Sequence, residues 1–372
     1  MRLRVAAVAV AALVAASTAL AAPHVGGRAY MVVNASTGET LLAYHQRERL
    51  PMASITKLMT VLVALEHAKL DDVVTVDGEA AAVGESSIYL RPGERLTVRE
   101  LVEAALIQSA NDAAVALASY VGHGDVDAFV AMMNRKAREL GLTDTRFANP
   151  DGLDAPGHYS SARDLTRLAQ VAMHDPVVRS IVRRRVARIS GGRTLHTWND
   201  LLSTFPSVIG VKTGHTSRAG WSEVAAARGP GVTVYATILG EPSRSARDDD
   251  LTRLLAWGLA QYRVVPVVRA GHVYASAAVP WGKRPLALAA DRRVLRVVRV
   301  GRRLVQRVVA PTVVSLPVRR GERLGEVAVY DRGALVARVA LRATRSISRP
   351  GVLARVGWYA KRTLRHVWSW LS

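Results

Sequence analysis

The sequence predicts an α+β fold with three parts: a mixed first domain, a small all-β domain and a C-terminal amphipathic helix. Three observations indicate this. Helical and strand-like hydrophobic spacings intermingle over the first part of the 372 residues, valine and arginine alternate from about residue 264 onward, and a basic, tryptophan-rich segment ends the sequence. The length suits roughly two domains, and a hydrophobic fraction of 49% is sufficient for buried cores.

The net charge and the absence of cysteine limit which functions are possible. The formal net charge of +21 comes almost entirely from arginine, because the chain has only six lysines. Such a charge predicts an anionic partner. The absence of cysteine excludes disulfides, thiolate nucleophiles and cysteine-based zinc sites, and the ten histidines include no HExxH pair. We therefore expect neither a metal site nor a cofactor.

Residues 1–21 have the pattern of a secretory signal peptide. Arg2 and Arg4 precede an apolar run over residues 5–16, and Ala19-Leu20-Ala21 gives the small-x-small pattern that signal peptidases cut. The run is short for a membrane-spanning anchor, so cleavage after Ala21 is favoured over a retained anchor. Export makes nucleic acid an unsuitable partner and favours anionic lipid or wall polymer.

Residues 22–263 are expected to form the mixed domain. The patterns predict a hairpin of strands 29–33 and 41–44, helices over 54–69, 125–140, 162–175 and 248–262, two helices within 98–121 with a break at 109–112, and adjacent strands in 208–211 and 222–239. Strands at both sequence ends of the domain can join one sheet, with the helices clustered beside it.

Residues 264–346 are expected to form the all-β domain. Short valine- and arginine-rich runs are separated there by turn signals such as Ala270-Gly271, Arg320-Gly321-Glu322 and Asp331-Arg332-Gly333.

Residues 350–372 are expected to form an amphipathic helix that binds a membrane surface. Apolar side chains fall on one arc and basic side chains on the opposite one, with Trp358 misplaced among the basic residues. A basic face, an apolar face and several tryptophans are typical of a helix in the membrane interface. Interspersed charges exclude a spanning helix. The alternative is a helix that docks on the protein's own core.

Ser54 and Lys57 are the first candidates for catalysis. They stand three residues apart in a segment expected to be helical and so share one face. A serine hydroxyl needs a nearby base, and a lysine can be that base when burial or a second cation lowers its pKa. Arginine cannot, since it stays protonated in proteins. The alternative is that Ser54 merely caps the helix.

Two further triplets can complete a site. Ser109 and Asn111, at the expected helix break, can relay a proton or hold a substrate amide. In Lys212-Thr213-Gly214, the lysine and the threonine suit a free carboxylate, and the glycine lets a substrate backbone approach an edge strand. Taken singly, each triplet is equally consistent with an ordinary turn.

The three triplets gain weight from their order. Two of the six lysines, Lys57 and Lys212, occupy them. Ser-x-x-Lys, then Ser-x-Asn about fifty residues later, then Lys-Thr-Gly about a hundred residues further on, is close to the motif set of penicillin-binding proteins and class A β-lactamases.

The chain resembles the serine-type D-alanyl-D-alanine carboxypeptidases, which are low-molecular-mass penicillin-binding proteins. The resemblance runs from about residue 28 to the C-terminus and includes residues 51–60, 84–87, 149–153, 160–165, 210–216 and 219–220. It implies a penicillin-binding/β-lactamase-like transpeptidase domain, a β-rich domain and an amphipathic anchor. It also implies an exported enzyme on the outer face of the cytoplasmic membrane that removes the terminal D-alanine from peptidoglycan pentapeptide stems.

The resemblance also implies residue roles. Ser54 would form the acyl-enzyme, and β-lactam antibiotics would acylate it as substrate mimics. Lys57 would take its proton, Ser109 would shuttle a proton and Asn111 would hold the substrate. Lys212 and Thr213 would bind the terminal carboxylate, with Gly214 and His215 beside them in the substrate-binding site, and the backbone N–H groups of Ser54 and His215 would form the oxyanion hole.

Two departures from the family pattern stand out. The second domain is unusually rich in arginine, and Ser222-Glu223 follows Trp221 where many relatives have Cys-Leu. Three alternatives remain open: a D,D-endopeptidase, a β-lactamase on the same scaffold, or a non-enzymatic, membrane-bound wall-binding protein. Ser109-Ala110-Asn111 in place of Ser-Asp-Asn, and the lack of a Glu-x-x-Leu-Asn motif, argue against the β-lactamase.

Overall fold

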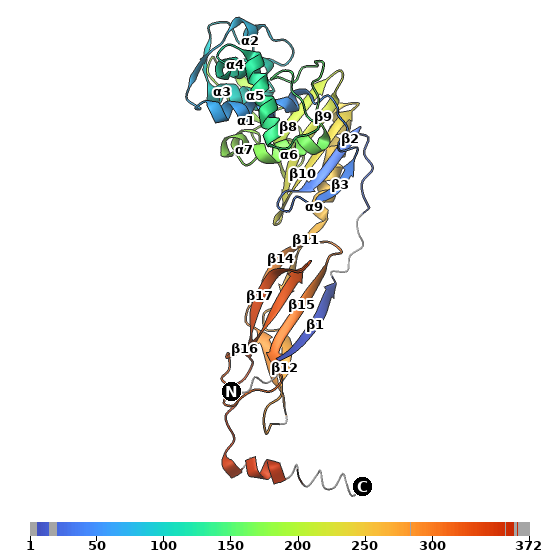
Figure 1. Ribbon diagram of the computed structural model, residues 1–372, viewed down its shortest axis with the longest axis vertical. Helices are drawn as coiled ribbons and strands as arrows, with labels where there is room; N and C mark the ends of the chain where they lie inside the picture. Colours follow the sequence, from blue (N-terminus) through green and yellow to red (C-terminus); the bar gives the residue numbers. More distant parts are fainter. Residues whose placement is uncertain (1–5, 15–20, 283, 354, 361–362, 364–372) are drawn as a thin grey trace. The chain divides into compact units, whose positions relative to one another are not determined.

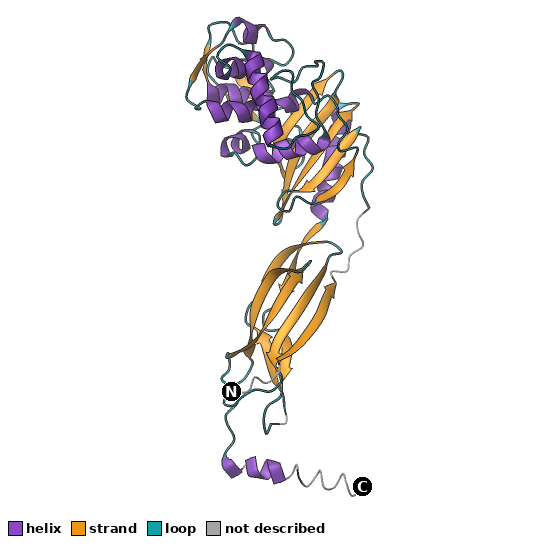
Figure 2. Cartoon of the chain, viewed as in Figure 1, coloured by secondary structure: helices purple, strands orange, loops and turns teal. Residues whose placement is uncertain are grey.

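The computed structural model describes residues 6–14, 21–282, 284–353, 355–360 and 363, and these fall into two compact units (Figure 1). One unit covers residues 20–261, and the other covers residues 262–372 together with 1–19. The first mixes helices and strands and the second is almost entirely β (Figure 2). The predicted α+β class is confirmed.

The N-terminal unit is built on one antiparallel sheet of five strands in the order β3-β2-β10-β9-β8. Its strands are β2 (Ala29–Asn34), β3 (Thr40–Tyr44), β8 (Val208–Thr216), β9 (Gly220–Gly229) and β10 (Val232–Glu241). Strand β2 pairs with β10, so strands from both sequence ends of the unit share the sheet, as predicted. Strand β8 is an edge strand.

Alternating side chains of this sheet enter two separate cores. Val33 packs with the helical cluster, which includes α6 (Ala162–Ala172), while its neighbour Val32 packs with α9 (Arg244–Ala260). Successive residues of a strand point to opposite faces, so helices cover both faces of the sheet. An edge strand between two such layers is open only along its free edge.

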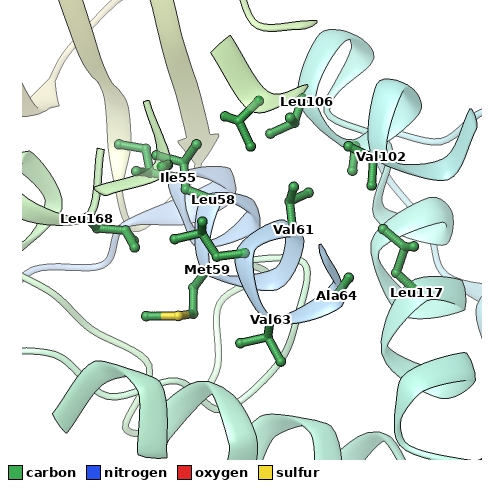
Figure 3. Close-up of a cluster of buried hydrophobic side chains, with 14 of the residues drawn as sticks. Ile55, Leu58, Met59, Val61, Val63, Ala64, Val102, Leu106, Leu117 and Leu168 are labelled. Carbon is green, nitrogen blue, oxygen red and sulfur yellow. The ribbon is translucent and has the colours of Figure 1, made fainter. Parts of the chain in front are cut away.

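Helix α1 (Lys57–His67) runs through the middle of the helical cluster. Its first eight residues are all buried, which is typical of a helix that is apolar on every side. Figure 3 shows Leu58, Met59 and Val61 of α1 among side chains from the surrounding helices, including Val102 and Leu117. Ser54 and Lys57 therefore stand at the start of a helix that packing holds on all sides.

The other elements of this unit surround α1 or its approaches. They are η1 (Ala53–Thr56, a 3-10 turn), α2 (Gly78–Ala82), α3 (Val98–Glu103), η2 (Ala104–Gln108, a π-helical turn), α4 (Asn111–Val121), α5 (Val126–Glu139), α7 (Pro176–Ile181), α8 (Leu201–Thr204), and the short hairpins β4 (Val73–Thr75) with β5 (Arg95–Thr97) and β6 (Val186–Arg188) with β7 (Thr194–His196).

Several predicted boundaries are wrong in detail. The helix predicted over 248–262 begins at Arg244 and ends at Ala260, and the one predicted over 162–175 ends at Ala172. The helix predicted from Ser54 begins with a 3-10 turn and becomes α-helical at Lys57, so Ser54 is not its N-cap. The strand predicted to end at Val211 continues to Thr216, so Lys212-Thr213-Gly214 lies within β8. Residues 222–239 form two strands, because Gly229-Pro230-Gly231 makes a turn, with Gly231 at φ 73°.

The C-terminal unit holds a six-stranded sheet in the order β1-β15-β16-β17-β13-β12 and a two-stranded sheet of β11 and β14. Their bounds are β1 (Ala6–Val14), β11 (Tyr262–Val268), β12 (Val273–Ala277), β13 (Leu286–Ala290), β14 (Val294–Arg299), β15 (Arg303–Pro311), β16 (Arg323–Asp331) and β17 (Ala334–Ala343). In β15, Arg303 and Arg307 are exposed while Leu304 and Val308 join the core. The alternation of valine and arginine thus marks inner and outer faces.

The two ends of the chain belong to this unit. Ala6–Val14, inside the predicted signal peptide, pairs antiparallel with β15 as strand β1. Of the predicted C-terminal amphipathic helix, residues 352–353, 355–360 and 363 are helical, and the rest lies outside the described residues. In the described part of the chain, no helix is both long enough and apolar enough to cross a membrane.

Candidate active site

The buried amine of Lys57 joins three distant segments of the chain. Its Nζ lies 2.9 Å from Ser54 Oγ, 2.7 Å from Asn111 Oδ1 and 2.6 Å from the backbone oxygen of Asp151. The lysine is completely buried. Three hydrogen bonds use every direction that a lysine amine offers, so the position of Nζ is fixed by these partners.

The state of this amine decides what Ser54 can do. Burial lowers the pKa of Lys57 to about 8, against the opposing effect of nearby carboxylates. The carbonyl oxygens of Asn111 and Asp151 only accept hydrogen bonds, so they take two amine protons. In the neutral amine the lone pair is then left to face Ser54 Oγ. This arrangement lets Lys57 accept the serine proton.

Two glycines pack closely against the backbone at Ser54. Ala53, just before Ser54, has φ 48°, an uncommon value for a residue with a side chain. A Cβ on Gly152 would stand 2.1 Å from the Ala53 oxygen and 2.9 Å from Ser54 N, and one on Gly214 would stand 3.2 Å from Ser54 N. Both glycines therefore let a neighbouring segment press against the Ser54 turn.

A second lysine–serine pair lies beside the first. Ser109 adopts the left-handed conformation with φ 63° where η2 ends, and α4 then begins at Asn111. Lys212 is a buried residue of β8, and its Nζ donates to Ser109 Oγ at 2.9 Å and to the Thr213 backbone oxygen at 2.9 Å. Burial, and then the charge of Lys57, lowers the pKa of Lys212 well below its usual value. The helix break at Ser109 thus brings the Ser109-Ala110-Asn111 triplet into contact with Lys212-Thr213-Gly214.

A pocket of about 380 Å³ opens above these groups. Its lining residues are Ser54, Glu85, Ser86, Ser109, Trp198, Thr213, Gly214, His215, Trp221 and Arg247. The predicted site residues therefore all lie together. The pocket is lined by Ser54, Ser109, Thr213, Gly214 and His215. The other three are buried beneath it: Lys57 is bonded to Ser54 and to Asn111, and Lys212 is bonded to Ser109.

Sequence reasoning missed half of the pocket wall. Trp198 and Arg247 carried no local motif, and Arg247 is one of many arginines in the chain. Glu85 and Ser86 stood in a segment that resembled the family but was given no role. The one usable signal was that segment, because it is polar and matches the family.

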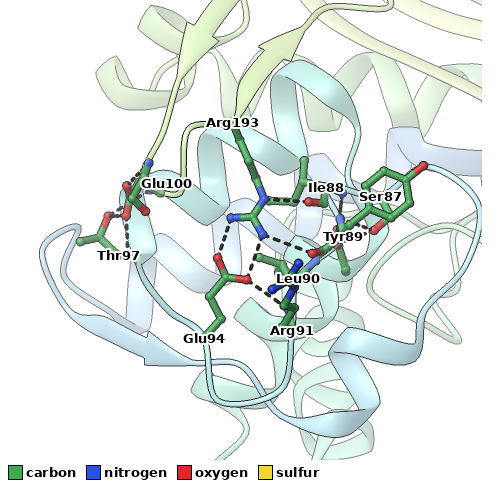
Figure 4. A network of polar contacts seen from close by, with 11 residues as sticks. Ser87, Ile88, Tyr89, Leu90, Arg91, Glu94, Thr97, Glu100 and Arg193 are labelled. Carbon is green, nitrogen blue, oxygen red and sulfur yellow. Dashed lines mark hydrogen bonds and ion pairs between the residues drawn. The ribbon is translucent and has the colours of Figure 1, made fainter.

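A polar network fixes residues 87–94, the loop that follows Glu85 and Ser86 (Figure 4). Arg193 donates from Nε to the Ile88 oxygen at 2.8 Å and from Nη2 to the Tyr89 oxygen at 3.2 Å, while Glu94 binds its guanidinium through both carboxylate oxygens. From below, the buried Asp112 accepts hydrogen bonds from the backbone N–H groups of Ile88 and Leu90. The loop next to Glu85 and Ser86 is therefore held from two sides.

A buried histidine supports the Ser54 turn from behind. His158 Nδ1 accepts from the Ala148 N–H at 3.0 Å, so Nε2 carries the proton and donates to Thr56 Oγ1 at 2.8 Å. Thr56 Oγ1 in turn donates to the Ala53 oxygen at 2.8 Å. Burial lowers the pKa of His158 to about 4. The neutral ring thus ties the 148–158 segment to the turn that presents Ser54.

Comparison with known proteins identifies the family of this chain. The profile of the peptidase S11 family, described as D-alanyl-D-alanine carboxypeptidase, matches residues 16–243. The chain belongs to this family. It is 32% identical over 353 residues to the D-alanyl-D-alanine carboxypeptidase DacD of Salmonella typhimurium, covering 91% of this chain and 90% of that protein. It is 29% identical over 347 residues to DacF of Bacillus subtilis, covering 90% and 88%.

Solved structures of family members show the same fold. Penicillin-binding protein 5 of Haemophilus influenzae matches with a TM-score of 0.65 at 26% identity, covering 89% of this chain and all of that one. The Streptomyces K15 DD-transpeptidase matches with a TM-score of 0.62 at 33% identity, covering 65% of this chain and all of that one. Both units of the present chain are therefore represented among its relatives.

We predict that His158 makes the fold sensitive to acid. Because its pKa is lower in the folded protein than in the unfolded chain, the unfolded state binds more protons between about pH 6.5 and pH 4, and stability falls as pH falls through that window. The shift corresponds to about 3 kcal/mol. Urea unfolding at pH 7 and at about pH 4.5 should show a smaller pH dependence for His158→Asn than for the wild type. His174→Asn, at an exposed histidine, is the control and should behave as the wild type does; equal pH dependence in all three proteins would contradict the prediction.

Proposed function

We propose that this chain is a serine-type D-Ala-D-Ala carboxypeptidase that removes the terminal D-alanine from peptidoglycan pentapeptide stems through an acyl-enzyme on Ser54. Membership of the carboxypeptidase family supports the reaction class. The observation that carries the residue assignment is the buried Lys57 amine, 2.9 Å from Ser54 Oγ and with its other two directions occupied by carbonyl oxygens.

The acylation step follows from these contacts. Neutral Lys57 takes the proton of the Ser54 hydroxyl while Oγ attacks the carbonyl carbon of the penultimate D-alanine. The backbone N–H groups of Ser54 and His215 stabilise the oxyanion. The C–N bond then breaks, and the leaving amine of the last D-alanine receives a proton through Ser109, which Lys212 holds at 2.9 Å. Water attacks the ester and regenerates Ser54.

The cationic side of the pocket explains the preference for a free carboxylate. Thr213 offers a hydroxyl, and Arg247 offers a guanidinium, both at the pocket wall. Lys212 adds positive charge from below, although its amine is already bonded to Ser109 and Thr213. Asn111 is assigned to the substrate amide, and its own side chain is fixed because Oδ1 accepts from Lys57 and Nδ2 donates to the Gly84 oxygen at 3.0 Å. β-Lactams carry an amide and a carboxylate at similar positions and would acylate Ser54 as substrate mimics.

The first prediction tests Ser54. The Ser54→Ala protein should release no D-alanine from a pentapeptide stem and should gain no mass from penicillin, because the acylated oxygen is gone. Ser180→Ala, an exposed serine in α7, should keep both properties. Release of D-alanine by Ser54→Ala at the wild-type rate would overturn the assignment. In the wild type, rapid loss of the penicillin adduct would favour a β-lactamase instead.

The second prediction concerns the pH dependence of acylation. Only neutral Lys57 can accept the proton, so the rate of penicillin acylation should rise with pH and level off above about 8. Lys57→Arg should lower the rate about 10³-fold on the plateau above about pH 8 and remove the rise with pH, because arginine does not give up its proton. Lys69→Arg, at an exposed lysine two residues beyond α1, should not change it. Stopped-flow or mass-spectrometric acylation rates between about pH 6 and pH 9 test this, and a flat profile would refute it.

We further propose that the protein is exported and held at an anionic membrane surface. The pattern of residues 1–21 supports cleavage after Ala21. The described part of the C-terminal helix supports the surface contact, since Val352, Leu353, Val356 and Tyr359 are all more than half exposed. Exposed apolar side chains beside basic ones suit an interface of anionic lipid.

The membrane proposal has its own measurement. A protein truncated before Pro350 should no longer co-sediment with vesicles containing anionic phosphatidylglycerol, while the longer protein should bind them and detach as salt is raised. The truncated protein should keep its penicillin acylation rate, which shows that the N-terminal unit is intact. Tight vesicle binding by the truncated protein would transfer the role to the arginine-rich strands.

A further inference from the structure

A carboxylate is buried directly behind the wall of the pocket. Glu223 on β9 is fully buried, and among the described residues neither of its carboxylate oxygens has a hydrogen-bond partner. In the sheet it stands opposite Thr213 on β8, and directly opposed residues of neighbouring strands point to the same face. Glu223 therefore lies one strand behind the hydroxyl that lines the pocket.

The group that Glu223 meets is the guanidinium of Arg247. Arg247 Nε lies 3.2 Å from Glu223 Oε2, and Nε and Nη2 donate to Asp248 Oδ1 at 2.9 and 2.6 Å. The guanidinium also lies over the ring of Trp221, 5.7 Å from its centroid, and that ring stacks on His215. Arg247 lines the pocket although its side chain is only 1% exposed.

A buried carboxylate without hydrogen bonds is costly unless a cation compensates it. Here the compensating cation is Arg247, which also lines the pocket. Asp248 holds the guanidinium from its own helix, and Glu223 holds it from the sheet. A long arginine side chain loses its rotational freedom when it is held from two sides.

We propose that Glu223 is a positioning residue that fixes the Arg247 guanidinium at the pocket wall and thereby sets how tightly the pocket binds the carboxylate end of its substrate. The proposal rests on the proposed function in one respect, that the pocket receives a peptide with a free carboxylate. Glu223 itself stays behind Thr213 and does not touch the substrate.

The charges around Glu223 give the interaction a pH dependence. Arg247, Asp248 and Arg244 act on it from α9, Lys212 acts from β8, and Asp200 acts from the residue before α8. Burial raises the pKa of Glu223 to about 8. Below that pH the neutral acid leaves the charge of Arg247 available to a ligand. Above it, the ionised Glu223 competes for the guanidinium and repels a substrate carboxylate.

The test measures binding apart from turnover. In a full-length Ser54→Ala background, calorimetry compares an N-acylated peptide ending in D-Ala-D-Ala with the same peptide as its C-terminal amide. Glu223→Leu should raise the Kd of the acid roughly tenfold, the scale of one charge-assisted hydrogen bond, and leave that of the amide within about twofold. Glu223→Gln keeps an acceptor for Arg247 and should retain the acid preference near pH 7.

The control is Glu103, another buried glutamate that pairs with an arginine, Arg184, at 2.9 Å outside the pocket. Glu103→Leu should keep the acid-over-amide preference of the parent. An unchanged preference in Glu223→Leu, or an equal loss for both peptides, would overturn the proposal, since the latter is what a merely structural role gives.

The glutamine variant keeps the idea testable if Glu223→Leu does not fold. As pH rises from about 7 to about 9, the Kd of the acid should increase more in the parent than in Glu223→Gln, which retains only what the buried lysines contribute. Identical profiles would refute the role of Glu223. Failure of the wild type to release D-alanine, with the acid preference intact, would instead refute the proposed function alone.

Discussion

The candidate active site depends on the exclusion of water from the amine of Lys57. The proposed role of Lys57 as a base requires that burial lower its pKa, and Lys57 stays buried because three segments close over it. Those segments meet at Ser54 Oγ, Asn111 Oδ1 and the Asp151 oxygen. The packing of α1 on all sides serves the same end, since a helix that could tilt would admit water to its first residue.

A second constraint is the balance of charge across β8. Lys212 and Lys57 each make the other's charge more costly, and Arg247 adds a third cation on the opposite face of the strand. Asp248, which is bonded to that arginine, offsets part of this repulsion from behind the wall. The pocket wall thus keeps a cation at Arg247 while burial and neighbouring charge keep the pKa of the two lysines low.

The three motifs and the pairing of distant strands were predictable from the sequence, whereas the half of the pocket wall that other segments contribute was not. The spacing of Ser54 and Lys57, the helix break at Ser109 and the scarcity of lysine all lie in short windows. Arg247 joins the pocket from the far side of the sheet, and no pattern within its own helix indicates this. The end of β8 was misjudged because polar residues such as Lys212 and Thr213 are buried there, which hides the alternation that predicts a strand.

The two glycines that pack against Ser54 have a consequence for antibiotic resistance. A side chain at Gly152 would collide with the Ala53 oxygen, and one at Gly214 would crowd the amide of Ser54. These two positions are therefore closed to substitution, because any side chain there would displace the turn that carries Ser54, on which β-lactam acylation is proposed to depend. Substitutions that reshape the pocket without crowding Ser54 are open at its outer rim, where Glu85 and Trp198 are exposed.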